Sequence, residues 1–107
     1  MSEHGTGLLL VMMDIDPEHE DDFNRWYDEE HVPERMAIPG FLTGRRYRAI
    51  EGGPKYLAIY EMDNPEVLDS PAYKYASGDG RSEWSARVVG RAKHYVRNVY
   101  VEMVPGE

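Results

Sequence analysis

Four segments of the chain have the hydrophobic patterns of β-strands. Residues 8–15 form an apolar run between Gly7 and Asp16, and a run this short is typical of a buried strand. In residues 56–62 the side chains alternate with a period of two, as in a strand. A turn at residues 51–54 joins this segment to residues 41–50, which predicts a hairpin. Aromatic and β-branched residues predict a last strand at residues 93–104.

A helical pattern separates the first two strands. Asp16 is suited to cap the helix and Pro17 to occupy its first position. Pro33 disfavours helical geometry at the residue before it, so we expect this helix to end near His31, with one more turn at residues 34–38. Side chains recur at spacings of three and four on one face of the helix: Phe23, Trp26, Tyr27, Glu30 and His31.

A second helical region follows the hairpin. It opens at residues 63–65 with Asp63 or Asn64 as its cap, and Pro71 predicts a break or kink inside it. Residues 82–90 form a further short helix that carries Trp84. The order β-α-β-β-α-β predicts an α+β, ferredoxin-like fold: a four-stranded antiparallel sheet with its helices on one face. We expect a single domain over residues 1–107, with residues 1–6 as a flexible tail.

The sheet face away from the helices needs a cover, because both sides of the first strand are apolar. Leu8, Leu10 and Met12 point to one side and the residues between them to the other. A sheet open to water would carry polar residues on one of these sides. The simplest cover is a second copy of the sheet, so we expect a homodimer in which two sheet faces pair into a dimeric α/β barrel.

Composition narrows the choice of partners. The net charge of −8 argues against nucleic acid and against an anionic membrane surface. The chain has no cysteine, which excludes disulfides and thiolate chemistry. It also has no apolar run of the length that a membrane span needs and no signal-peptide pattern at its start, so we expect a cytoplasmic protein.

Several motifs resemble one family of this fold. They are W-Y-D-E-E-H-V-P at residues 26–33, P-G-F at 39–41, R-R-Y at 45–47 and K-Y-L-A-I-Y-E at 55–61. Together they resemble the EthD-like branch of the dimeric α/β-barrel superfamily, over residues 8–75. Related barrels include cofactor-free monooxygenases of aromatic polyketides, muconolactone isomerases and haem-binding members. The resemblance implies a pocket between the helices and the sheet of each subunit.

His31 is the strongest candidate for chemistry, because a histidine gives and takes protons near neutral pH. The alternative is a structural histidine bonded to a backbone carbonyl. Tyr60 is a candidate hydroxyl donor from the sheet. Arg45 and Arg46 point to opposite faces of one strand, so one of them is expected to orient an anionic group, unless both are solvated or ion-paired.

Aromatic side chains supply the candidate lining of the pocket, although each also packs well in a strand or core. The candidate substrate-binding residues are Trp26, Tyr27, Tyr47, Tyr56, Tyr73 and Trp84. No metal site is predicted: His19 and His31 lie roughly 18 Å apart along one helix and cannot share an ion. Haem ligation by His31 is implied only by analogy with the superfamily.

We therefore predict a small-molecule enzyme that needs no cofactor. It would perform acid/base chemistry (isomerisation, cyclisation, elimination or oxygenation) on an apolar aromatic or polyketide-like metabolite. Two alternatives stay open, a non-catalytic metabolite-binding or accessory dimer and a haem-binding barrel. Fold alone does not choose between them.

Overall fold

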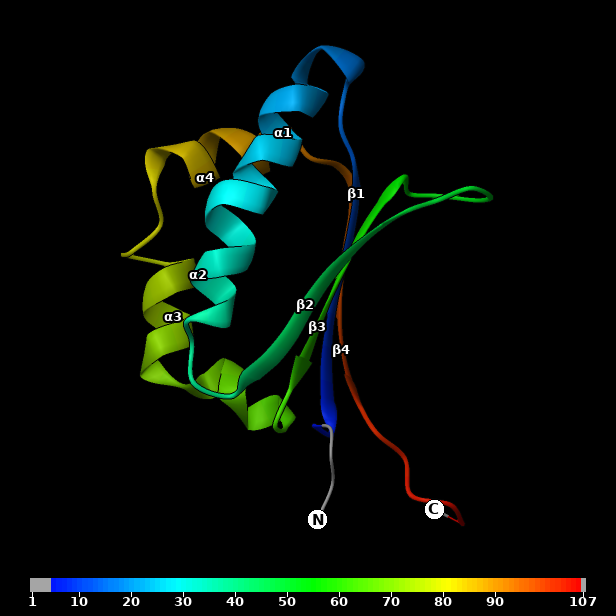
Figure 1. The fold of residues 1–107 in the computed structure, drawn as a ribbon, viewed down its shortest axis with the longest axis vertical. Helices are drawn as coiled ribbons and strands as arrows, with labels where there is room; N and C mark the ends of the chain where they lie inside the picture. Colours follow the sequence, from blue (N-terminus) through cyan, green and yellow to red (C-terminus); the bar gives the residue numbers. More distant parts are fainter. Residues whose placement is uncertain (1–4, 107) are drawn as a thin grey trace.

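Four antiparallel strands form one sheet in the order β2-β3-β1-β4 (Figure 1), in a computed structural model that describes residues 5–106. The strands are β1 (Gly7–Asp14), β2 (Phe41–Arg48), β3 (Tyr56–Met62) and β4 (Lys93–Val101). The predicted ferredoxin-like fold is confirmed, with each strand close to its expected range. The last strand ends at Val101 rather than at Val104.

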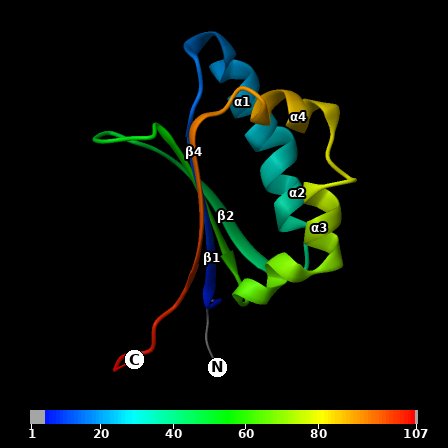
Figure 2. The ribbon, with the colours of Figure 1, turned by 180° about the vertical axis from the view of Figure 1, so that it is seen from behind.

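The helices lie together on one face of this sheet, as Figures 1 and 2 show from opposite sides. The first connection contains a 3₁₀ turn η1 (Pro17–His19), α1 (Glu20–Trp26), a π-helical turn η2 (Tyr27–His31) and α2 (Val32–Met36). The second contains a 3₁₀ turn η3 (Pro65–Asp69), α3 (Pro71–Ser77) and α4 (Glu83–Val89).

The first helix does not end near His31, and this expectation was wrong. The backbone continues through η2 into α2, because the N–H of Val32 donates to the carbonyl of Tyr27, five residues earlier. The wider π turn brings Pro33 to the start of α2, where its missing N–H and fixed φ are tolerated. Asp16 also makes no side-chain cap; its carboxylate binds Lys93 Nζ at 2.7 Å instead.

The break predicted at Pro71 is confirmed. Ser70 has extended backbone angles between η3 and α3, and its hydroxyl accepts a hydrogen bond from the N–H of Tyr73. Asn64 caps η3 by accepting from the N–H of Glu66, and Ser82 caps α4 by accepting from the N–H of Ser85. Both caps are of the type that short polar side chains provide.

The core lies between the helical layer and the inner face of the sheet. Trp26 and Phe23 are each 1% exposed, and Met62 and Tyr60 on β3 are equally enclosed. The register pairs Leu9 with Tyr60, so β1 and β3 turn their inward side chains to the same layer. Of the predicted tail, residues 1–4 lie outside the described residues, and Thr6 is held by hydrogen bonds to Asp63 and Glu102.

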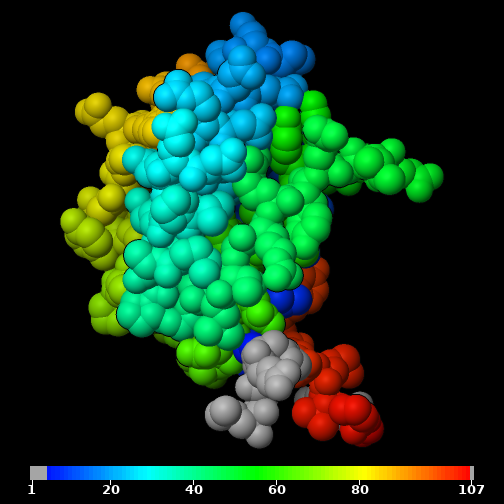
Figure 3. All heavy atoms as spheres, viewed as in Figure 1, coloured from blue at the N-terminus to red at the C-terminus, as the bar shows by residue number. Residues whose placement is uncertain are grey.

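Two parts of the chain project from the sheet on the side away from the helices. One is the hairpin between β2 and β3, and the other is the segment that follows β4 (Figures 1 and 3). At the hairpin tip Ile50 is almost fully exposed, and Met103 and Val104 are exposed beyond β4. Apolar side chains thus extend past both ends of the outer sheet face.

We predict that Gly40→Ala destabilises the fold more than Gly52→Ala does. Both glycines have positive φ, 99° and 78°, so alanine is strained at either position. A Cβ at Gly40 would also lie 2.5 Å from Cγ2 of Val67, a stiff β-branched side chain, whereas nothing lies within 4 Å at Gly52. Urea unfolding should show a difference of about 1–3 kcal/mol. Equal losses in the two variants would contradict the close packing at Gly40.

Candidate functional site

A cavity of about 70 Å³ lies between the helices and the inner face of the sheet. Residues from every strand except β2 line it, together with α1, η2, α2, α3 and α4. The lining is part apolar, from Leu9, Val11, Met13, Ala76 and Val89, and part polar or aromatic: Trp26, Tyr27, His31, Arg35, Tyr60, Tyr73, Arg81, Ser85, Tyr95 and Arg97. This is the pocket position that the sequence resemblance implied.

Aromatic contacts fix the ring of His31 at one wall of this cavity. The ring stacks on Trp26 with centroids 4.2 Å apart and meets Tyr27 edge-on at 5.2 Å. Tyr60 approaches from β3, edge-on at 6.3 Å. The π turn carries His31 over the ring of Trp26, five residues earlier in the chain, and such turns are frequent at functional sites.

Three buried polar atoms on residues that line this cavity have no hydrogen-bond partner among the described residues. They are Nδ1 of His31, the hydroxyl oxygen of Tyr60 and Nη1 of Arg35. Most buried polar groups in folded proteins are paired, so each exception asks for an explanation, of which a catalytic role is one. Because all three residues line the same cavity, a ligand there would lie beside each of them.

Burial controls the protonation of these groups. Desolvation, followed by the positive charges of Arg35, Arg81 and Arg46, lowers the pKa of His31 to about 3. Desolvation also raises the pKa of Tyr60 and brings that of Tyr27 to about 12. At cellular pH the cavity therefore presents a neutral imidazole and protonated tyrosine hydroxyls.

Sequence reasoning missed the arginines of the cavity. Arg35 is 9% exposed, and its guanidinium lies 5.0 Å above the ring of Tyr73. Arg97 on β4 donates a hydrogen bond to the Tyr73 hydroxyl at 3.0 Å, and Arg81 approaches from the loop before α4. Their spacing in the sequence gives no hint of this convergence, since they come from three separate elements.

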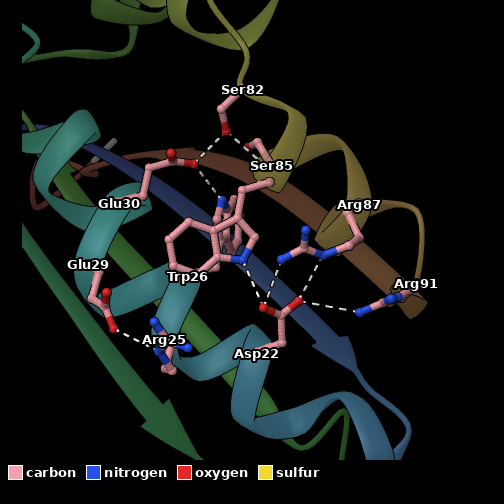
Figure 4. Close-up of polar contacts among 10 residues, drawn as sticks. Asp22, Arg25, Trp26, Glu29, Glu30, Ser82, Ser85, Arg87 and Arg91 are labelled. Carbon is pink, nitrogen blue, oxygen red and sulfur yellow. Dashed lines mark hydrogen bonds and ion pairs between the residues drawn. The ribbon is translucent and has the colours of Figure 1, made fainter.

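A polar network fastens α4 over the first helix (Figure 4). Asp22 accepts hydrogen bonds from Trp84 at 3.0 Å and from Arg87 at 2.9 Å, and it pairs with Arg91 at 3.3 Å. Nearer the cavity, Glu30 carries the second half of the network. Its Oε2 accepts from Trp26 Nε1 at 3.0 Å and from the hydroxyl of Ser82, the cap of α4, at 2.6 Å.

The structure brings together five of the ten residues predicted as site residues: Trp26, Tyr27, His31, Tyr60 and Tyr73 line the cavity. Arg46 faces the helices but lies outside the lining. It binds Asn24 at 2.8 Å and Asp28 at 3.3 Å, with its guanidinium 4.4 Å above the ring of Tyr27.

The other four predicted residues lie away from the cavity. Arg45 and Tyr47 pair with Ile59 and Leu57 and share the outer face of the sheet with them. The hydroxyl of Tyr56 donates to Glu20 at 2.5 Å. Trp84 is held by Asp22 and lies outside the lining, so it contributes to the position of α4 rather than to the wall.

Comparison with protein families gives a direct match. The model of a family described as a domain of unknown function, DUF4286, matches residues 7–80. The chain belongs to the DUF4286 family. No curated protein matches it. The matched region of this DUF4286 protein runs from β1 to the end of α3 and includes His31, Tyr60 and Arg35.

Solved structures share the fold. An EthD family protein from Bacillus halodurans superposes with a TM-score of 0.62 at 21% identity, over 91% of this chain and 99% of that one. A dimeric ferredoxin-like protein from an uncultured marine organism superposes with a TM-score of 0.71 at 15% identity, over 96% of this chain and 92% of that one. The haem degrader MhuD from Mycobacterium tuberculosis, with two haems bound in its active site, superposes with a TM-score of 0.60 at 15% identity, over 94% of this chain and 99% of that one. The EthD-like resemblance is confirmed at the level of the fold.

Residues 5–106 contain neither a cluster of metal ligands nor a membrane-spanning helix. No group of three or more histidine, aspartate or glutamate side chains there is placed to hold a metal ion. No helix in the same range has the length and apolar character to cross a membrane.

We predict that His31 makes the stability of the fold depend on pH between about 6.5 and 3. In this window the unfolded chain takes a proton on His31 that the folded chain does not, so stability falls as the pH falls. The slope from this group is on the order of 1 kcal/mol per pH unit. Urea unfolding at several pH values should show a shallower dependence for His31→Gln. A His31 NMR titration near pH 6.5 in the folded protein would contradict the prediction.

Proposed function

We propose that this chain is an enzyme that moves a proton on a small metabolite without a cofactor, with His31 as the general acid/base. The observation that supports it is the pair of buried, unpartnered atoms, His31 Nδ1 and the Tyr60 hydroxyl, at one cavity. A non-catalytic binding protein would more simply have a filled core and a histidine bonded outward.

The protonation states suit an enolisation. A neutral His31 is able to accept a proton from a C–H next to a carbonyl group. The Tyr60 hydroxyl remains protonated and donates a hydrogen bond to the oxygen on which negative charge develops. Because His31 and Tyr60 meet this cavity among buried aromatic rings, the hydrogen bond is stronger than it would be in water. Isomerisation, elimination and reaction of the enolate with oxygen all begin with this step.

The size of the cavity limits the substrate. Ligand pockets for drug-sized molecules measure roughly 300–1,000 Å³, well above the 70 Å³ found here. The volume favours a substrate of a few atoms, or the reacting end of a longer one, over a polyketide ring system enclosed whole.

The same observation weighs against haem. A porphyrin is far larger than this cavity, and the His31 ring is stacked against Trp26 with its Nδ1 buried. The residues present therefore do not fit haem. Haem binding is described for the mycobacterial protein of similar fold.

We propose further that two copies pair through the outer sheet faces. This face carries Leu10, Leu57 and Ile59, and no helix among residues 5–106 covers it. Tyr47 and Tyr100 on the same face are each 49% exposed. The projecting hairpin and C-terminal segment would reach around a partner sheet (Figure 3). A protein of similar fold is described as dimeric.

We predict that wild-type protein catalyses exchange of an acidic C–H with D₂O in a panel of small carbonyl compounds, followed by ¹H NMR. His31→Gln should lower the rate by on the order of 10²-fold or more, and Tyr60→Phe by about 10²-fold. Tyr75→Phe is the control, because Tyr75 is exposed on α3. Circular dichroism checks that each variant is folded. Full activity in His31→Gln would refute the proposed role.

We also predict that wild-type protein is a dimer by light scattering coupled to size exclusion, and that Ile59→Glu is monomeric. A charge in the middle of an apolar interface loses its hydration when the sheets pair. Tyr75→Glu, on the helical side, should remain dimeric. A monomeric wild type, or a dimer that tolerates Ile59→Glu, is the result that would sink the sheet-to-sheet arrangement.

A further inference from the structure

The charged residues that line the cavity are all of one sign. Arg35, Arg81 and Arg97 line it, and the lining contains no aspartate or glutamate. The whole chain has 20 acidic and 12 basic residues. The lining therefore carries only positively charged side chains, of which Arg35 is buried and Arg81 and Arg97 are exposed, and such side chains attract anions.

The arginines also retain unused donors. Nη1 of Arg35 is buried without a hydrogen-bond partner, and its nearest carboxylate oxygen, from Glu34, is 3.8 Å away, beyond hydrogen-bond distance. Within residues 5–106, no carboxylate forms an ion pair with Arg81 or Arg97. A guanidinium has five N–H donors, so most of those on Arg97 remain after its bond to Tyr73.

We propose that the cavity binds a short-chain carboxylic acid, with the carboxylate at Arg35, Arg81 and Arg97 and its reacting carbon at His31. The proposal rests on the proposed function and names its substrate class. Guanidinium groups bind carboxylates through paired hydrogen bonds, which fixes orientation as well as affinity. The small volume admits a short acid, and Val89 and Tyr95 provide the apolar contact for its chain.

A β-keto acid fits both ends of this site. Its carboxylate would lie at the arginines, and the C–H between carboxylate and ketone would face His31. The C–H proton moves to Nδ1 of His31, and the electron pair moves onto the ketone oxygen, which accepts a hydrogen bond from the Tyr60 hydroxyl. Return of the proton to carbon restores the imidazole, so the step needs no oxidant or reductant.

The bound anion would assist this transfer. Arg35, Arg81 and Arg46 are the positive charges that disfavour protonation of His31, whose other neighbours are the rings of Trp26, Tyr27 and Tyr60. A carboxylate against Arg35 and Arg81 offsets their charge at the moment His31 takes up the proton. The same arginines that select the anion therefore stop opposing the chemistry once it is bound.

The test compares acetoacetate with acetoacetamide, which has a similar shape and no charge. Titration calorimetry on wild-type protein should give a Kd for acetoacetate at least about tenfold lower than for the amide. Arg97→Met and Arg81→Met should each raise the Kd for acetoacetate by about tenfold and leave the Kd for acetoacetamide unchanged. Arg97→Lys should recover part of the loss. Arg48→Met is the control, since Arg48 is exposed at the end of β2, outside the cavity.

Two results would overturn the proposal: equal affinity for acid and amide, or arginine variants that bind acetoacetate as Arg48→Met does. Exchange measurements separate it from the proposed function. Arginine-dependent binding of acetoacetate without catalysed exchange would support the anion site and refute the enzyme. Catalysed exchange on neutral compounds, without preference for the acid, would support the enzyme and refute the anion site.

Discussion

The position of Trp26 is the constraint on which the rest of the site depends. Its indole is 1% exposed, its face supports the His31 ring at 4.2 Å, and its N–H donates to Glu30. Glu30 in turn holds Ser82, the cap of α4. One side chain thus fixes the candidate base and, through a single carboxylate, the helix that closes the cavity. Both tasks require Trp26 to lie at the end of α1, where the π turn begins.

The π turn explains why the helix serves two purposes. In an α-helix of regular pitch, residues 26 and 31 would be rotated further apart than i and i+4 neighbours are. The wider turn brings them onto one side and also absorbs Pro33 into the continuing helix. The helical segment therefore continues into α2, which places Arg35 at the cavity. A helix that ended at His31 would leave that arginine in a loop.

The fold was largely predictable because its signals are local. Strand periodicity, the hairpin turn and the break at Pro71 each depend on neighbouring residues, and each was correct. The aromatic stripe of the first helix also led to His31. The arginines were not predictable, because their convergence depends on how α2, the loop before α4 and β4 pack. The helix end predicted from Pro33 was wrong for the opposite reason. The local rule that a helix stops before a proline was overridden by a π turn that the sequence does not signal.

A small anion held between arginines and a neutral histidine is the central feature of this site, and a crystal structure with acetoacetate tests it most directly. We expect the carboxylate within hydrogen-bond distance of Arg35 and Arg97, with the methylene carbon next to His31 Nδ1 and the ketone oxygen at the Tyr60 hydroxyl. Acetoacetate bound elsewhere, or a cavity that stays closed with His31 bonded to the protein, would contradict it.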